Sequence, residues 1–258
     1  EALHTLLQDL DEPDFDRATE FKGWTLNNVI RHLHVWNLAA DLSLTDEAGF
    51  DTFYARVGEN SSGGGLPAFE AAYLEGLSGQ ALLSTWRASF QVVADHFRSA
   101  DPSLRVKWAG PSMSARSSIT ARLMETWAHG QEVYDELGVR RENADRIRNI
   151  VVLGNNTYGW TYAVRGEEPP SPIPHLVLTA PSGEVWRYNE PSDAERIEGL
   201  AEEFCQVVTQ VRNIADTDLK VVGDVATDWM SKAQCFAGPP ETPPAPGVRR
   251  MRTTGAGG

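Results

Sequence analysis

GWTLNNVIRHLHVWNLAADLSL, residues 23–44, predicts a long amphipathic helix. Its apolar residues recur every three to four positions and fall on one stripe of a helix: Leu26, Val29, Ile30, Leu33 and Trp36. We expect this helix to begin near Thr25 and to pack its stripe against other helices.

Three further stretches outside this helix carry the same helical periodicity. They are residues 1–10, 78–100 and 114–137, the last closed by Gly138 as a C-cap. SSGGG at 61–65 predicts a loop between the second and third helices. Four long amphipathic helices pack most economically as a four-helix bundle, so we expect that architecture for the first part of the chain.

The character of the chain changes after residues 141–165, which predict one more helix. GEEPPSPIP at 166–174 cannot continue a helix and predicts a linker. The pattern behind it predicts a small α/β domain, in this order: a hairpin from 175–183 and 184–191, a helix at 197–211, a strand at 219–224 and a helix at 225–237.

The sequence therefore predicts an α+β chain in three parts. We expect a helical bundle at 1–168, a small α/β domain at 169–238, and a disordered tail at 239–258, which is rich in Pro and Gly. The chain has 258 residues, 41% of them hydrophobic and 23% charged, which is enough apolar material for a folded core.

The net charge excludes several classes of partner. At −13 the chain has no broad basic face to neutralise a phosphate backbone or an anionic membrane surface, so we expect neither nucleic-acid nor membrane binding. No apolar run reaches the length of a spanning helix, and the acidic N-terminal stretch lacks the basic residues of a signal peptide. We expect a cytoplasmic protein that binds a small-molecule substrate; its oligomeric state stays open.

The positions of the two cysteines and the absence of common motifs reduce the number of candidate reactions. Cys205 and Cys235 lie outside any CxxC pattern, so we interpret them as reduced, buried thiols without a catalytic role. The sequence has no GxGxxG after a strand and no GxxxxGK[ST], GxSxG or HExxH. Dinucleotide, nucleoside triphosphate, serine-hydrolase and common zinc-protease functions all lose their main support.

Candidate metal ligands stand on two of the predicted helices. In METWAHGQEVYDELG at 124–138, Glu125 and His129 are four residues apart and share one helical face, where a carboxylate and an imidazole can hold the same cation. Glu132 borders the same arc. On the helix of residues 23–44, either His32 or His34 could add a third ligand, and periodicity does not choose between them. Three protein ligands with an open fourth position are typical of a catalytic zinc site.

These two stretches resemble known motifs. GWTLNNVIRHLHVWN resembles the Gly-Trp-Thr helix ending in His-Leu of the DinB-like, mycothiol-dependent maleylpyruvate isomerase family, and ETWAHGQEV resembles the second metal motif of that family. The resemblance implies His32, Glu125 and His129 as ligands of one divalent metal, with zinc the preferred ion. His34 then becomes a neighbour, and we expect it to line the substrate pocket together with Trp36 and Glu132.

The resemblance extends to the second domain. Members of the family carry a C-terminal α/β domain similar to sterol carrier proteins, with a helix that ends in an Arg important for activity. The matching residue in FCQVVTQVRNIADTDLKVVGD is Arg212, which we expect to be catalytic by holding an anionic group. ARLMETWAHGQEVYDELGV is also similar to an actinobacterial branch whose substrates are largely unassigned.

The implied chemistry uses mycothiol, a sugar-based thiol of actinobacteria, as cosubstrate. The cation would ionise the thiol, which could add to a double bond, allow rotation and leave, or stay attached. The leading hypothesis is therefore a metal-dependent isomerase or thiol S-transferase.

Two alternatives remain. One is a thiol-independent hydrolase, isomerase or cyclase in which the cation activates water or a carbonyl. The other is a non-catalytic binding protein whose metal only braces the bundle.

Overall fold

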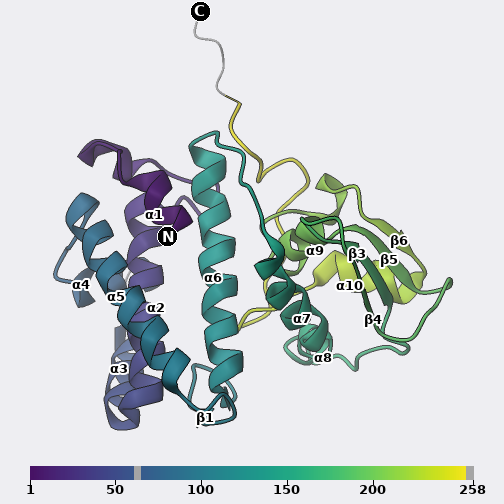
Figure 1. Ribbon diagram of the computed structural model, residues 1–258, viewed down its shortest axis with the longest axis horizontal. Helices are drawn as coiled ribbons and strands as arrows, with labels where there is room; N and C mark the ends of the chain where they lie inside the picture. The colour runs from purple at the N-terminus through teal and green to yellow at the C-terminus, as the bar shows by residue number, and fades with distance from the viewer. Residues whose placement is uncertain (61–64, 254–258) are drawn as a thin grey trace, which may run out of the picture. The chain divides into compact units, whose positions relative to one another are not determined.

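The structure is a computed structural model, and it describes residues 1–60 and 65–253. The chain divides into two compact units, Glu1–Leu137 and Gly138–Gly258. Figure 1 shows the first unit as almost entirely helical and the second as a small sheet with helices. The predicted α+β class is confirmed, and each unit is described by itself below.

The first unit is built around helix α2 (Leu26–Thr45), which packs against α3, α4, α5 and α6. The other elements of the unit are α1 (Ala2–Leu7), the 3-10 helix η1 (Glu12–Asp16), α3 (Glu47–Asn60), α4 (Gly65–Tyr73), α5 (Gly79–Ser99), α6 (Ala115–Glu136) and the strands β1 (Arg105–Val106) and β2 (Met113–Ser114). The two short strands pair antiparallel and lead the chain from α5 into α6.

The predicted helices are all present in this unit, with α1 shorter than expected. Thr25 is the N-cap of α2, and Gly138 adopts a positive φ of 66° after α6. The pattern predicts no helix between residues 45 and 78, whereas the structure has α3 and α4 there. Helix α3 keeps most of its face in solvent, so it lacks a wide apolar stripe. Of the predicted loop at 61–65, residues 61–64 lie outside the described residues.

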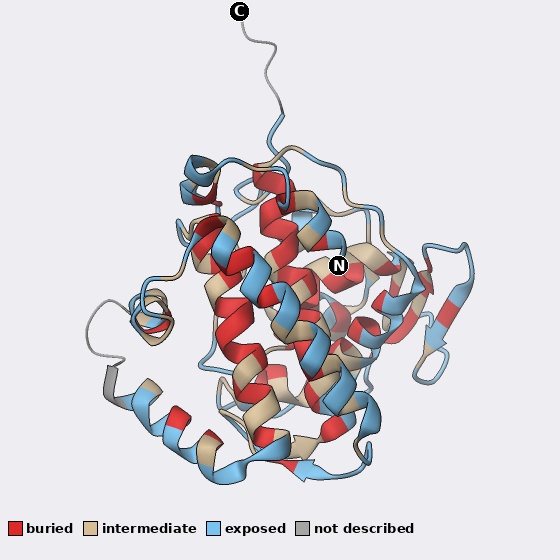
Figure 2. Cartoon of the chain, turned by 60° about the vertical axis from the view of Figure 1, so that its left-hand side comes forward, coloured by how far each residue is buried: buried red, intermediate tan, exposed pale blue. Residues whose placement is uncertain are grey.

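Two clusters of buried side chains form the core of this unit. One joins α1, α2, α5 and α6 and includes Leu33, Trp86 and Val133; the other joins α2, α3 and α4 and includes Trp36 and Phe53. Buried and exposed residues alternate along the outer helices in Figure 2, as expected for helices with one buried face, whereas α2 has no exposed residue before Thr45. Helix α2 contributes to both clusters, which is why its sequence is apolar over more than one stripe.

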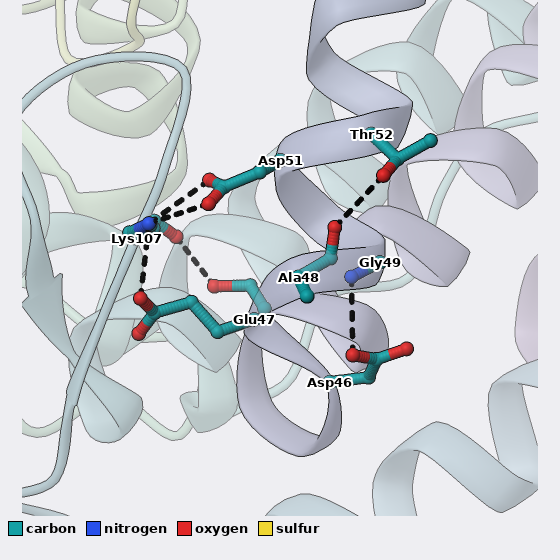
Figure 3. A network of polar contacts seen from close by, with 8 residues as sticks. Asp46, Glu47, Ala48, Gly49, Asp51, Thr52 and Lys107 are labelled. Atoms are coloured by element: carbon teal, nitrogen blue, oxygen red, sulfur yellow. Dashed lines mark hydrogen bonds and ion pairs between the residues drawn. The ribbon is translucent and has the colours of Figure 1, made fainter.

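Ion pairs fix the segment between α5 and α6 to α3. The Nζ atom of Lys107 lies 2.9 Å from Oε1 of Glu47 and 2.7 Å from Oδ2 of Asp51, as Figure 3 shows. These pairs are exposed and individually weak. Together they hold the neighbouring Trp108 in place, where its ring lies 5.6 Å from that of Trp36 between centroids.

The second unit contains one four-stranded sheet in the order β4-β3-β5-β6. Its elements are η2 (Asp145–Ile147), α7 (Arg148–Asn156), α8 (Tyr158–Ala163), β3 (His175–Thr179), β4 (Val185–Tyr188), β5 (Arg196–Leu200), α9 (Ala201–Val208), η3 (Ile214–Asp216), β6 (Lys220–Val222) and α10 (Asp224–Lys232). Strands β3 and β4 form the predicted antiparallel hairpin, while β3 and β5 run parallel. Phe204 and Trp229 are completely buried in its core.

Three features of this unit differ from the prediction. The expected helix at 141–165 is divided into η2, α7 and α8. These pack on α9 and α10, so they belong with the second unit and the division falls after Leu137 instead of after residue 168. The expected helix at 197–211 begins as a strand, because residues 197–200 pair with β3.

The Pro/Gly-rich tail also differs from the expected disorder over its described part, residues 239–253. The side chain of Gln210 donates to the carbonyl of Glu241 at 3.2 Å, and that of Asn213 donates to the carbonyl of Pro244 at 2.8 Å. Arg249 donates back to the carbonyl of Gln210 at 2.7 Å. Backbone carbonyls of the tail thus accept hydrogen bonds from the side chains of Gln210 and Asn213. The composition of the tail does not reveal these contacts. Residues 254–258 lie outside the described part.

No helix in residues 1–60 or 65–253 combines the length and the apolar character that crossing a membrane requires.

Candidate metal centre

The turn before α2 sets the entry to the candidate site. Ala18 and Thr25 form an isolated antiparallel bridge, and the hydroxyl of Thr19 donates to the carbonyl of Trp24 at 2.9 Å. Gly23 turns the chain with a φ of 69°, a conformation in which a residue without Cβ is unstrained. Thr25 then accepts a hydrogen bond from the backbone N–H of Asn28. Each residue of the Gly-Trp-Thr sequence therefore has a local structural role. Gly23 allows the chain to turn, Thr25 caps α2, and Trp24 packs against His32 and His129.

Three potential ligands converge where α2 meets α6. The ligand atoms of His32, Glu125 and His129 all lie within 4.8 Å of one another. Oε2 of Glu125 lies 3.3 Å from Nε2 of His129 and 3.7 Å from Nε2 of His32. In the part of the chain that the structure describes, this cluster consists of these three side chains.

The spacing fits a small divalent cation. Ligand atoms about 2.1 Å from a tetrahedral ion are separated by about 3.4 Å, close to the 3.3 and 3.7 Å that separate Oε2 of Glu125 from the two imidazole nitrogens. Two imidazole nitrogens and one carboxylate oxygen form a donor set that zinc and several other first-row metals accept. The side chains of His32, His129 and Glu125 are 11%, 12% and 22% exposed, so a small molecule in solvent has access to the cluster.

Aromatic rings enclose the two imidazoles. The Trp24 indole stacks on His129 with an interplanar angle of 7° and meets His32 edge-on, with centroids 5.2 Å apart. Phe21 contacts His129 edge-on at 5.0 Å. These rings restrict the imidazole rotamers and lower the local dielectric, which strengthens electrostatic interactions at the cluster. Sequence pattern alone did not identify Phe21 or Trp24 as site residues.

Glu70 of α4 is the main site residue that the sequence pattern missed. Its side chain is completely buried, and its Oε1 lies 2.7 Å from Nδ1 of His32 and accepts the indole N–H of Trp36 at 3.0 Å. A carboxylate on Nδ1 leaves Nε2 of His32 free to face Glu125, which is the usual arrangement around a metal-ligating histidine. The available signal was a lone acid in the apolar run LPAFEAAYL at 66–74.

Replacing Glu70 by Gln tests whether the Glu70 carboxylate orients His32 for metal binding. The amide keeps the size of the carboxylate but loses its charge, so it holds His32 less firmly in the tautomer with a free Nε2. We expect Glu70→Gln to weaken divalent-metal binding roughly tenfold to hundredfold. The measurement is the dissociation constant by competition with a chromophoric chelator. Glu75→Gln, an exposed position after α4, is the control. An unchanged constant in Glu70→Gln would remove Glu70 from the site.

The protonation states of Glu125 and His129 favour metal binding, whereas that of His32 opposes it. Burial raises the pKa of Glu125, but His129, His32 and Arg122 outweigh it and hold that pKa well below its ordinary value. Burial lowers the pKa of His129, which keeps its imidazole neutral near pH 7. Burial also disfavours charge on His32, but hydrogen bonds to Glu125 and Glu70 dominate and raise its pKa to about 9. A metal ion must therefore displace a proton from His32.

This proton sets the pH dependence of metal affinity. Because the pKa of His32 is raised from 6.5 to about 9 in the folded protein, the charged ring stabilises the metal-free fold below pH 6.5, and that contribution is lost as pH rises through 9. Metal competes with the proton, so its affinity should rise about tenfold per pH unit up to about pH 9. Chelator competition at several pH values checks this. A pH-independent affinity between pH 7 and 8.5 would contradict the proton displacement.

The other predicted site residues lie in different surroundings. Trp36 borders the cluster, since its ring centroid is 6.1 Å from that of His32. His34 and Glu132 are buried, at 3% and 2% exposed, outside the three-ligand cluster, and burial lowers the pKa of His34. Arg212 follows α9 in the second unit, where its Nη1 donates to the carbonyl of Val211. The pocket role of His34 and Glu132 and the catalytic role of Arg212 stay predictions.

Comparison with known proteins places the chain in a family. A family model described as the mycothiol maleylpyruvate isomerase N-terminal domain matches residues 1–134. The chain belongs to this family. The matched residues include His32, Glu125 and His129, so the candidate metal centre lies wholly within the region that defines the mycothiol maleylpyruvate isomerase family.

Similar chains are also found among individual proteins. Two uncharacterized proteins of Mycobacterium tuberculosis, from the strains CDC 1551 and H37Rv, are each 38% identical over 239 residues, which is 92% of this chain and 92% of theirs. A crystal structure of the mycothiol-dependent maleylpyruvate isomerase is 18% identical, covers 80% of this chain and 82% of that one, and has a TM-score of 0.49. A histidine-to-alanine mutant of that enzyme is 19% identical, with the same TM-score and coverage.

Proposed function

We propose that this protein is a metal-dependent enzyme of the mycothiol-dependent isomerase or thiol S-transferase type. Its metal is one divalent cation, with zinc preferred, held by His32, Glu125 and His129. The observation that carries the proposal is the convergence of these three ligand atoms within 4.8 Å in a member of this family. The substrate is a small electrophile, and mycothiol is the cosubstrate.

The residues of the site have distinct roles. A divalent cation held at three protein ligands lowers the pKa of a thiol or water that occupies its open position. His32 and His129 supply neutral nitrogens, and Glu125 supplies one negative charge. Glu70 holds the ring of His32, and Trp24 keeps bulk water from one side of His129. In the second unit, Arg212 is proposed to hold an anionic group of the substrate or the thiol.

The ligand count supports an enzyme over a structural metal site. A structural zinc is closed by four protein ligands, whereas catalytic sites keep one position open. The cluster has three ligands among residues 1–60 and 65–253, and the side chains of all three are partly accessible to solvent.

The experiment is turnover by the metal-loaded protein with two electrophiles, maleylpyruvate and an alkyl halide, each with and without mycothiol. Isomerisation of the double bond or formation of a thioether that requires both metal and mycothiol is the expected result. Turnover that needs metal but no thiol would support the thiol-independent hydrolase, isomerase or cyclase instead. A protein that binds no metal, or one that binds metal without any turnover of either electrophile, would overturn the proposed function.

A further inference from the structure

A cavity in the second unit lies at the ends of its two parallel strands. Strands β3 and β5 are the central pair of the four-stranded sheet and run parallel (Figure 1). The cavity has a volume of about 520 Å³, and residues at the carboxyl ends of both strands line it: Thr179, Ala180 and Pro181 from β3, and Leu200 and Glu202 from β5. This volume lies within the range of small-molecule sites in proteins. All lining residues belong to the second unit, so the cavity is distinct from the three-ligand cluster.

The order of the strands makes the end of this strand pair a favourable place for a ligand. The chain leaves β3 for β4 on one side of the pair, and it leaves β5 through α9 for β6 on the other side. In α/β sheets, ligands bind in the crevice at the carboxyl ends of adjacent parallel strands whose connections diverge in this way. Thr179 and Leu200 are partners in the parallel register, so their side chains stand side by side there. Leu200 is 51% exposed and offers an apolar surface to a ligand.

Four charged side chains line the same cavity, two of each sign: Arg140, Arg141, Glu142 and Glu202. In the described part of the chain, neither Arg140 nor Glu202 forms an ion pair or a side-chain hydrogen bond, with each other or with another residue. The hydroxyl of Thr179 makes no hydrogen bond there either. The cavity therefore presents a cationic donor, an anionic acceptor and a hydroxyl that are all available to a ligand.

The neighbouring acid on α9 shows that this availability is specific to Glu202. The carboxylate of Glu203 accepts the backbone N–H of Asp218 at 3.0 Å, so it is used within the fold. Glu202 also stands in the first turn of α9, where its negative charge disfavours an anion that would otherwise be attracted to the helix N-terminus. A simple anion meets Glu202, and a simple cation meets the arginines. Both charges are satisfied by a ligand that carries a carboxylate and an ammonium group, since a guanidinium pairs with a carboxylate and a carboxylate accepts from an ammonium.

We propose that this cavity binds a free amino acid with an aliphatic side chain. Arg140 holds the carboxylate of the amino acid, Glu202 holds its ammonium group, and Leu200 contacts its side chain. The inference goes beyond the proposed function and does not depend on it, because the cavity shares no residue with the metal centre.

The test is calorimetric titration of the full chain with three probes of one shape. L-leucine carries both charges, N-acetyl-L-leucine keeps only the carboxylate, and L-leucinamide keeps only the ammonium group. We expect L-leucine to bind at least about tenfold more tightly than either blocked probe, as the loss of one charge-assisted hydrogen bond predicts. Neither metal nor mycothiol is needed, so the result is independent of the outcome for the proposed function.

Two variants assign each charge to its residue. Arg140→Met should weaken L-leucine binding roughly tenfold to hundredfold and leave L-leucinamide binding unchanged. Glu202→Gln should weaken L-leucine binding to a similar extent and leave N-acetyl-L-leucine binding unchanged. Arg146→Met is the matched control, because Arg146 is an exposed arginine of the same segment that does not line the cavity, and it should bind L-leucine as the wild type does.

Three outcomes would overturn the inference. The first is no binding of L-leucine at millimolar concentration. The second is a blocked probe that binds as tightly as L-leucine, since the ligand class would then be a simple anion or cation. The third is wild-type affinity for L-leucine in both Arg140→Met and Glu202→Gln, which would place the amino acid elsewhere on the protein. Arg140 is exposed and Glu202→Gln keeps the size of the side chain, so neither variant threatens the fold.

Discussion

His129→Ala is expected to abolish stoichiometric metal binding and thiol-dependent turnover together. The substitution removes one of three ligands, and the remaining pair, His32 and Glu125, cannot enclose a cation from three sides. The loss should exceed the roughly tenfold to hundredfold effect typical of residues that only support a ligand. Metal content after gel filtration and the dissociation constant from chelator competition measure it.

Two further variants make this result specific. His129→Gln fills more of the space of the ring, so it separates loss of a ligand from loss of packing against Trp24 and Phe21. His96→Ala is the matched control, because His96 also sits beside a carboxylate, with Nδ1 2.7 Å from Oδ1 of Asp41, but on the surface of α5. It should bind metal as the wild type does. Turnover in His129→Ala at the wild-type rate would show that the reaction does not depend on this metal.

Trp229→Ala is expected to destabilise the second unit by about 3–5 kcal/mol, the usual range for an aromatic residue removed from a core. Trp229 is completely buried, and its ring packs edge-on against Tyr158 and Phe204 at centroid distances of 5.0 and 5.7 Å. These contacts join α10 to α8 and α9, so a cavity there weakens three helices at once. Urea unfolding followed by hydrogen exchange of peptides from residues 138–238 measures the change.

The matched control for the second unit is Val222→Ala on β6. Val222 is 47% exposed, so its truncation should change the free energy of unfolding by no more than about 0.5 kcal/mol. A Trp229→Ala effect as small as that of Val222→Ala would mean that α8, α9 and α10 do not share one core.

Residue spacing within one helix predicts part of the site. The rest depends on tertiary packing, which spacing alone does not predict. Glu125 and His129 share a face because four residues span about one helical turn, which any helix at that position guarantees. Periodicity could not choose between His32 and His34; the family resemblance did, and the structure brings His32 to the cluster. Glu70 could not be found by spacing, since its place beside His32 depends on how α4 packs on α2.

The same distinction explains the fold. The long helices and the β3–β4 hairpin follow from patterns within a few residues, and both are confirmed. The division between the units depends on which core a segment joins. The Pro-rich run at 166–174 looks like a linker, yet α7 and α8 before it bury their apolar residues in the second unit, as Tyr158 does against Trp229. Composition likewise could not reveal the hydrogen bonds that hold residues 239–249.

We expect His32, Glu125 and His129 to hold one divalent metal, and X-ray absorption of protein loaded with one equivalent of zinc identifies the atoms bound to that metal. The spectrum should show a shell of nitrogen and oxygen atoms at about 2.0–2.2 Å, with the outer-shell scattering of two imidazoles and no sulfur. Less than one equivalent of bound zinc, or a sulfur shell at about 2.3 Å that places the metal on Cys205 or Cys235, would contradict it.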